Sequence, residues 1–193
     1  MKYPLGTKQT NKNINFGKRG MGLEDDINSS NNYYLVHNIA VVHKKPTPVQ
    51  VTKVIYPEKV IKEAYFKTPS TTDYNGIYKG YYIDFEAKET KTNFFPLKNI
   101  HNHQIKHLED IEKHSGISFI IIRFTNLNET YYLETKQLLN FIKNETRKSI
   151  PIEYFKQNAY IIKDKINPLV DYIEIIEKYI LKGKRLWKKK SKN

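Results

Sequence analysis

An acid and a lysine lie two positions apart in the stretch GYYIDFEAKET, residues 80–90, as Glu86 and Lys88. Apolar and polar residues alternate here, which predicts a β-strand with Asp84, Glu86 and Lys88 on one face. A lysine beside carboxylates could orient water or stabilise charge on phosphorus in phosphodiester hydrolysis. The motif is short, however. An exposed polar face with an ordinary Glu–Lys pair, contributing at most about 1 kcal/mol, would have the same pattern.

The strand is expected to be one arm of a hairpin, and two turns are open. Asn75-Gly76 is the stronger dipeptide signal, and Lys79-Gly80 is the alternative. We favour Lys79-Gly80 because an Asn-Gly turn leaves too few residues before it to pair with the long second arm. In the favoured hairpin, Gly76 marks a bulge or a place of close approach. Both arms then have strand-like lengths, 71–78 and 81–90.

The favoured turn brings a second carboxylate to the same face. Residue 78 pairs with 81, and continuing this ladder places Asp73 opposite Glu86 and Thr71 opposite Lys88. Two carboxylates facing each other across strands destabilise a sheet, so something should offset their repulsion. A bound divalent cation such as Mg²⁺ would do so. On the same ladder Asp84 faces Asn75, and we expect Asp84 to be a solvated residue without a role.

The net charge of +13 is concentrated in the tails. Residues 1–19 hold five basic residues and 182–193 hold seven, with no acid in either, whereas residues 20–181 hold 21 basic and 20 acidic residues. Basic tails on a balanced body favour a polyanionic partner, and nucleic acid comes first. An anionic membrane fits less well because neither tail has an apolar face. Tails that only aid solubility are the remaining interpretation.

Composition and pattern favour one intracellular domain. The 193 residues suffice for one sizeable core, and the absence of cysteine excludes disulfides and Cys-ligated zinc and fits a reducing cytoplasm. Periodicity predicts one α/β domain with a central mixed sheet flanked by helices. The expected helices are 23–37, 103–114, 135–144, 151–157 and 171–182. The expected strands are 38–44, 49–57, 60–66, 71–78, 81–90, 117–124 and 130–134. The tail 1–19 is expected to be disordered.

Longer segments carry a resemblance to a known family. Asp73 followed by Glu86-Ala87-Lys88 resembles the PD-(D/E)xK nuclease core, although Thr72 stands where that motif has proline. RGMGLEDDIN, YYLVHNIAVVHKKPTPVQ, VIKEAYFKTPSTTDYNGIYKGYYIDFEAKET, FPLKNIHNHQIKHL and DYIEIIEKY together resemble the RecU family of Holliday junction resolvases. The resemblance covers residues 19–181. It implies a restriction-endonuclease-like nuclease domain over 20–181, with a protruding β stalk at 47–70 that enters the junction, between basic tails.

The resemblance also implies an activity and a set of residue roles. The family is a homodimeric, Mg²⁺-dependent endonuclease of DNA recombination and repair, with Mn²⁺ as the expected substitute metal. Lys88 matches its transition-state lysine, and Glu24 matches an acid that such cores place beside the metal. The positions that match the family's metal ligands are Thr71, Asp73, Glu86 and Gln104.

Other residues could meet DNA or hold a different metal. Lys44 and Lys45 beside Pro46, together with Arg19, are candidate phosphate contacts. Trp187 lies in the basic run KRLWKKK and packs either on nucleic acid or on the protein surface. A zinc site at the histidines is a weaker alternative because a fourth ligand is missing, and structural or DNA-facing roles are favoured. These histidines are His101, His103 and His107.

Two other functions remain compatible with the sequence. One is a nuclease of the same core that acts on another branched DNA, such as a flap or a fork. The other is a non-catalytic junction-binding or recombination scaffold protein. Recombination proteins are further candidate partners, and no membrane partner is expected.

Overall fold

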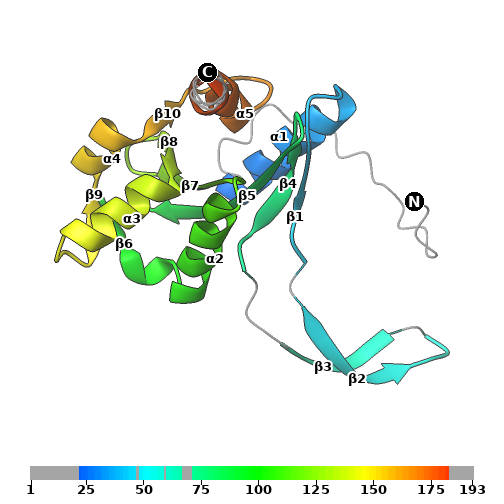
Figure 1. Cartoon of the computed structure of the whole chain (residues 1–193). Coiled ribbons are helices and arrows are strands. Elements are labelled where there is room, and N and C mark those ends of the chain that lie inside the picture. The colour runs from blue at the N-terminus through cyan, green and yellow to red at the C-terminus, as the bar shows by residue number, and fades with distance from the viewer. Residues whose placement is uncertain (1–21, 47, 59, 67–70, 183–193) are drawn as a thin grey trace.

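A six-stranded mixed sheet forms the centre of the computed structural model, which describes residues 22–46, 48–58, 60–66 and 71–182 (Figure 1). The strand order is β1-β4-β5-β7-β8-β10. Strands β5 and β7 run parallel, and the other neighbouring pairs are antiparallel. The strands are β1 (Val41–Lys44), β4 (Tyr74–Tyr78), β5 (Tyr81–Thr90), β7 (Ile117–Phe124), β8 (Glu129–Glu134) and β10 (Tyr160–Ile162).

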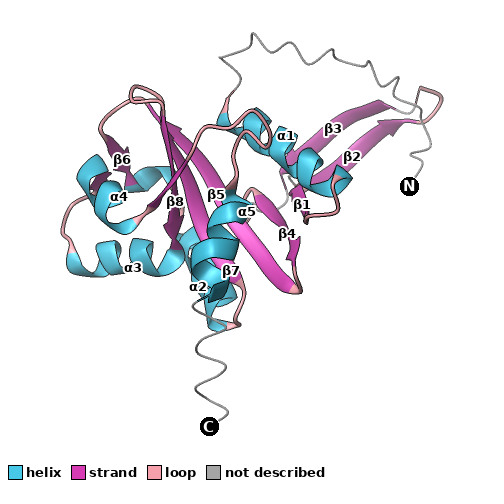
Figure 2. Cartoon of the chain, turned by 90° about the horizontal axis from the view of Figure 1, so that it is seen from above, coloured by secondary structure: helices cyan, strands magenta, loops and turns pink. Residues whose placement is uncertain are grey.

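Helices cover both faces of this sheet (Figure 2). Helix α1 (Leu23–Val36) and α5 (Tyr172–Ile175), which continues as the π-helical segment η2 (Ile176–Leu181), pack on one face with the β5 side chains Ile83 and Phe85. The other face carries α2 (Asn102–Lys113), α3 (Thr135–Asn144) and α4 (Ile152–Asn158). The predicted single α/β domain with a central mixed sheet is confirmed.

Strand β5 lies third in the sheet, between β4 and β7, so both of its faces are covered. Ile83 and Phe85 point to the α1 side, which leaves Asp84 and Glu86 on the α2 side, and both carboxylates are fully buried. The strand is therefore buried like β7, although its sequence alternates between apolar and polar residues. Burial makes the charges of the second face costly unless they have partners.

The hairpin register is the favoured one. Tyr78 pairs with Tyr81 and Asn75 with Asp84, so the turn is at Lys79 and Gly80, with φ of 49° and 80°. Two positive φ angles suit a two-residue turn that follows the twist of the strands.

Gly76 serves close approach, because β4 and β5 pair without a bulge there. A Cβ atom on Gly76 would lie 2.1 Å from the carbonyl oxygen of Val41, on the neighbouring strand β1. The pairing of β1 with β4 therefore requires glycine at this position.

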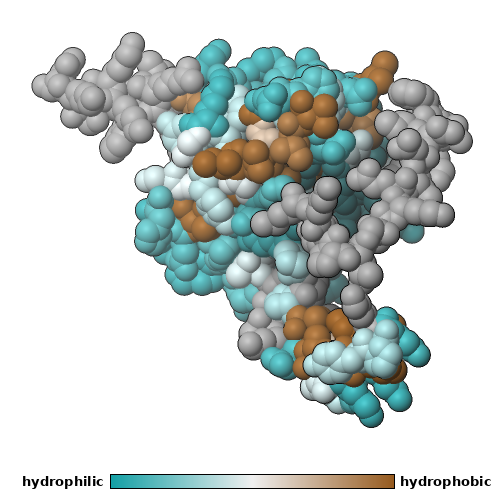
Figure 3. All heavy atoms as spheres, turned by 90° about the vertical axis from the view of Figure 1, so that its right-hand side faces the viewer, coloured by the Kyte–Doolittle hydropathy of each residue, from teal (hydrophilic) through white to brown (hydrophobic). Residues whose placement is uncertain are grey.

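A two-stranded stalk projects away from the body. Its strands are β2 (Val49–Ile55) and β3 (Val60–Phe66), and they pair only with each other (Figure 1). Large hydrophobic side chains are exposed along it, among them Tyr56, Ile61 and Tyr65. Figure 3 shows hydrophobic surface on the stalk. The predicted protruding β stalk is confirmed. The positions 47, 59 and 67–70 fall outside the described residues.

The element boundaries differ from the prediction in short segments. Strand β1 begins at Val41 rather than at residue 38, because Asn38 has a left-handed φ of 54° that a strand cannot contain. Three strands of three residues each were not predicted, since so short a segment shows no periodicity: β6 (Phe94–Pro96), β9 (Ser149–Pro151) and β10. The 3-10 turn η1 (Leu97–Asn99) follows β6.

No helix in the described part of the chain is long and apolar enough to cross a membrane. The expectations for the basic tails, including the disorder of 1–19 and the environment of Trp187, lie outside the described residues.

Candidate active site

Asp73 and Glu86 face each other at the end of the β4–β5 hairpin. The backbone N–H of Asp73 donates to Glu86 Oε2 at 3.1 Å, and the backbone N–H of Ala87 donates to Asp73 Oδ2 at 3.1 Å. Both acceptors are side-chain oxygens, because the regular β4–β5 pairing ends at Tyr74 and Phe85. Each carboxylate is oriented by a main-chain donor next to the other, which fixes the two groups relative to each other.

Lys88 lies between the two carboxylates. Its Nζ forms a short ion pair with Glu86 Oε1 and lies 3.6 Å from Asp73 Oδ2. Lys88 is two residues beyond Glu86 on the same strand face, so the alternation of β5 places the ammonium group there. The sequence-predicted grouping of Asp73, Glu86 and Lys88 is present in the structure.

Helix α2 adds Gln104 to this cluster. Gln104 is almost fully buried, and its Nε2 donates to Glu86 Oε1 at 2.8 Å. Its Oε1 accepts from the backbone N–H of His101 at 3.0 Å, which caps the first turn of α2. An amide oxygen has two lone pairs, so this hydrogen bond leaves one for another ligand.

The charges of this cluster perturb one another. Burial, and then the negative charge of Asp73, raise the pKa of the Glu86 carboxyl to about 7. Burial acts to lower the pKa of Lys88, but its hydrogen bond to Glu86 and the charges of both carboxylates outweigh burial and raise that pKa above its usual value. Lys88 is therefore an ammonium ion at neutral pH. The pKa of Glu86 is raised because burial and the charge of Asp73 together outweigh the ion pair with Lys88.

The chemistry of these donors fits a divalent cation. Two carboxylates within one buried cluster repel each other, and Glu86 keeps its proton up to neutral pH unless a cation compensates it. Oxygen donors are what hard cations such as Mg²⁺ take. No three His, Cys, Asp or Glu side chains of the described residues gather as a metal site, so amide or hydroxyl oxygens would have to complete the set.

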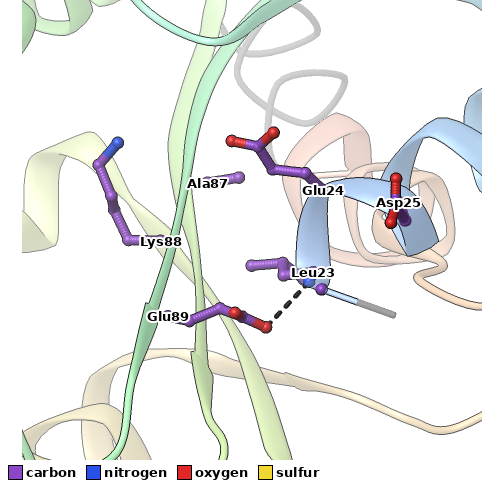
Figure 4. Close-up of a pocket in the computed structure, with 7 residues that line it drawn as sticks. Leu23, Glu24, Asp25, Ala87, Lys88 and Glu89 are labelled. Atoms are coloured by element: carbon purple, nitrogen blue, oxygen red, sulfur yellow. Dashed lines mark hydrogen bonds between the residues drawn. The ribbon is translucent and has the colours of Figure 1, made fainter. Parts of the chain in front are cut away.

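Glu24 lines a hollow of about 410 Å³ between the first turn of α1 and the end of β5 (Figure 4). The Lys88 side chain points to the opposite side of β5, away from Glu24. Leu23 N–H donates to Glu89 Oε1 at 2.9 Å and attaches the helix start to the strand. Glu24 itself forms a short ion pair with Lys44, and both side chains are about half exposed.

Thr71 contacts a lysine rather than the cluster of Asp73, Glu86 and Lys88. Lys45 Nζ donates to Thr71 Oγ1 at 3.0 Å, to Thr72 Oγ1 at 2.6 Å and to Asp84 Oδ2 at 2.7 Å. Only 16% of the Lys45 side chain is exposed. Lys45 therefore points inward in this structure. Arg19 lies outside the described residues.

The expectation that Asp84 is solvated was wrong. Asp84 is fully buried, and besides Lys45 it accepts from Tyr82 OH at 2.8 Å, forms a short hydrogen bond with Thr72, and lies 3.2 Å from His107 Nε2. The sequence contained a signal for this burial. Strand 117–124, which pairs with β5 in the structure, is apolar on both faces, so the polar face of its neighbour had to be covered as well.

Two further groups have structural surroundings. Arg123 is a structural partner, because its Nη1 lies 2.6 Å from Asp26 Oδ2 on α1. The rings of His101 and His103 stack with centroids 5.4 Å apart, whereas His107 contacts Asp84. The three histidines thus have different surroundings rather than one common site.

Comparison with known proteins identifies the family. The family model described as Recombination protein U, RecU, matches residues 18–178. A Holliday junction resolvase RecU of Geobacillus sp. (strain WCH70) is 52% identical and covers 92% of this chain and 96% of its own length. The chain belongs to the RecU family. Another member, the Holliday junction resolvase RecU of Pediococcus pentosaceus, is 48% identical, covering 92% of this chain and 96% of its own.

A solved structure gives a weaker likeness. The Holliday junction resolvase Hjc of Archaeoglobus fulgidus is 10% identical, with a TM-score of 0.43, and covers 69% of this chain and 89% of its own. The resemblance inferred from the sequence segments is therefore confirmed by the RecU family match and not by this structure.

Proposed function

We propose that this chain is a Holliday junction resolvase, an endonuclease that acts in DNA recombination and repair. The observation that carries the proposal is the cluster of Asp73, Glu86 and Lys88, a partly buried and a fully buried carboxylate held by main-chain amides with an ammonium group between them. The relatives that match almost the whole chain are named for this activity. The absence of cysteine favours action in a reducing cytoplasm.

The site supports metal-dependent hydrolysis of a phosphodiester. We propose that a divalent cation, Mg²⁺ with Mn²⁺ as a substitute, is held by Asp73 and Glu86, with Gln104 and Thr71 as further oxygen ligands. When bound, the cation would polarise the scissile phosphate and activate water. Burial of the carboxylates and their main-chain hydrogen bonds hold these ligands in place before substrate arrives.

Lys88 supplies a fixed positive charge to the reaction. Because its pKa is raised, Lys88 remains protonated and cannot act as a general base at neutral pH. Its ammonium group would orient the attacking water and stabilise the charge that develops on phosphorus. Water adds to phosphorus as the bond to the 3′ oxygen breaks, which leaves a 5′-phosphate and a 3′-hydroxyl. Glu24, in the first turn of α1, would be an additional acid beside the metal.

Paired cuts follow from symmetry. A four-way junction has approximate two-fold symmetry, and a C2 dimer presents two identical sites to it. We therefore propose a homodimer that makes two symmetric nicks. The stalk would enter the junction centre. The lysine-rich tails, with Arg19 and Lys44, would supply salt-sensitive contacts to phosphate that carry little sequence information. Lys45 was predicted as a third contact of this kind, and its inward position suggests another role.

A synthetic four-way junction tests the proposal directly. The protein is mixed with labelled junction in the presence and absence of Mg²⁺, and we expect paired nicks with 5′-phosphate ends only when Mg²⁺ is present. Glu86→Gln is the matched control, since it keeps the side-chain shape and should bind without cutting. Cuts confined to flaps or forks would indicate a nuclease for another branched DNA. Junction binding with no cutting of any substrate would indicate a scaffold protein.

A further inference from the structure

Lys45 joins the two ends of the stalk. It lies between β1 and β2, where the chain leaves the body, and Thr71 and Thr72 lie where the chain returns from β3. The ammonium group of Lys45 donates to both threonine hydroxyls, and the backbone N–H of Lys45 donates to the carbonyl of Asp73 at 2.8 Å. One residue thus fastens the outgoing segment to the returning one at the base of the stalk.

Asp84 is the buried anion of this arrangement. We call Lys45, Thr71, Thr72 and Asp84 the base clasp. Asp84 is fully buried, and its carboxylate forms an ion pair with Lys45 and accepts a hydrogen bond from the Thr72 hydroxyl. A buried carboxylate requires such partners, because an unpaired one is strongly unfavourable.

Two further contacts attach the clasp to the body. Tyr82 OH, on β5, donates to Asp84 Oδ2 at 2.8 Å, and His107 Nε2, on α2, lies 3.2 Å from the same oxygen. His107 is three residues beyond Gln104, so both side chains project from neighbouring turns of α2. Asp84 is therefore in contact with every element that supplies a proposed metal ligand.

The clasp also fixes the segment that carries Thr71 and Asp73. That segment is irregular, because β4 begins only at Tyr74, and strand pairing alone does not hold its first residues. Two clasp members, Thr71 and Thr72, directly precede Asp73. The positions of these proposed metal ligands thus depend on the Lys45–Asp84 ion pair.

We propose that Lys45 and Asp84 are positioning residues that hold the 71–73 segment in its metal-binding geometry and connect the stalk to the active site. This inference rests on the proposed function. A role for Lys45 as a phosphate contact fits less well. All three donors of its ammonium group are used by the clasp, and turning it outward would leave Asp84 buried without its cation.

The first test is backbone hydrogen exchange of the metal-free protein. Lys45→Met removes the cation at similar side-chain length, and Lys44→Met is the matched control, since Lys44 is adjacent and pairs with Glu24 at the surface. We expect the amides of Asp73 and Ala87 to exchange at least roughly tenfold faster in Lys45→Met and at the wild-type rate in Lys44→Met. Unchanged exchange in Lys45→Met would overturn the proposal.

The second test separates positioning from general damage. We expect Lys45→Met to bind Mn²⁺, titrated by calorimetry without DNA, about 10–100-fold more weakly, as is usual when a group that orients metal ligands is removed. Lys45→Arg, which keeps the charge, should recover most of this affinity. Junction affinity and its salt dependence in Ca²⁺ should stay at the wild-type level. A salt slope shallower by about 1 with unchanged Mn²⁺ affinity would make Lys45 a phosphate contact.

Asp84→Asn should weaken Mn²⁺ binding in the same way, and thermal melting shows whether it folds. If it does not fold, Lys45→Met and Lys45→Arg test the positioning role by themselves.

Failure of the proposed function is a distinct result, because a wild-type protein that binds no Mn²⁺ and cuts no junction would refute that function. Hydrogen exchange of the metal-free variants would still determine whether the clasp holds the 71–73 segment.

Discussion

Asp73 and Glu86 orient each other through the main chain: the N–H of Asp73 donates to Glu86, and the N–H that follows Glu86 donates to Asp73. This reciprocal pair keeps two carboxylates side by side in spite of their repulsion. Both main-chain donors belong to the hairpin itself, and Lys88 and Gln104 of helix α2 add further contacts to Glu86. Conservative substitutions should therefore remove charge from the site while leaving the hairpin folded.

Asp73→Asn and Glu86→Gln should each reduce cleavage of a four-way junction by at least about 10²–10³-fold, because the metal's stabilisation of transition-state charge is worth several kcal/mol. Single-turnover cleavage in Mg²⁺ measures the loss. Junction binding, measured in Ca²⁺, should change little, since the tails and stalk remain. Cleavage at the wild-type rate in either variant would contradict the assignment of these ligands.

Metal affinity should rise with pH through neutrality. A metal ligand must be deprotonated, and the pKa of Glu86 is about 7 because of burial and then the charge of Asp73. Below pH 7 the proton competes with the metal, so affinity should fall about tenfold per pH unit, and above pH 7 it should level off. Calorimetric titration with Mn²⁺ at pH 6, 7 and 8 tests this. A constant affinity over that range would show that Glu86 is already ionised.

The same pKa predicts how the metal-free protein responds to pH. Folding raises the pKa of Glu86 from its usual value of 4.5 to about 7, so the protonated carboxyl favours the folded state. This contribution to the free energy of unfolding is fully present below pH 4.5 and is lost as the pH rises through about 7. Thermal melts at pH 6 and 8 should show a smaller loss of stability in Glu86→Gln, which has no such proton, than in the wild type.

Lys88→Met should slow the chemical step by about 10²–10³-fold, as for other fixed charges that face a developing anion. The reason is that Lys88 is a cation at neutral pH and lies between both carboxylates. Single-turnover rates with saturating Mg²⁺ measure the effect. Lys106→Met, which removes an exposed ammonium from α2, is the control and should cleave normally. Equal rates for both variants would reduce Lys88 to a structural role.

Two glycines of the hairpin should respond differently to alanine. Gly76→Ala places a Cβ 2.1 Å from a main-chain oxygen of β1, so it should separate β1 from β4 and cost about 1–3 kcal/mol or more. Gly80→Ala meets no atom within 4 Å, and only its φ of 80° opposes it, at about 1–2 kcal/mol. Urea denaturation measures both. If Gly80→Ala were the more damaging variant, the close approach of β1 would be refuted.

Ending the chain at Leu181 should flatten the salt dependence of junction binding, because it removes seven basic residues. For every phosphate that the protein no longer neutralises, the slope of log affinity against log salt falls by about 0.9. Fluorescence anisotropy at several salt concentrations measures this slope. A full-length variant with these seven residues replaced by serine controls for chain length. An unaltered slope would leave the C-terminal tail without a role in DNA binding.

The sequence alone was sufficient for the fold class, the hairpin and the grouping of Asp73, Glu86 and Lys88. The alternation in 80–90 predicted the strand, and the Lys79-Gly80 turn placed Asp73 against Glu86, because pairing in a hairpin is determined by its turn. Local rules suffice where both partners lie on one short hairpin. Family resemblance was needed for Gln104, since helix α2 is brought to β5 by packing that no local pattern encodes.

Tertiary structure decided which charges are buried. Asp84 and Lys88 belong to the same strand face, yet Asp84 is fully buried and Lys88 is only partly so, because α2 and the base of the stalk cover one end of β5. Lys44 and Lys45 are adjacent, but one is exposed on the surface and the other closes the clasp. Burial depends on which elements pack together over long sequence distances, so the structure was required to distinguish a solvated charge from a buried and paired one.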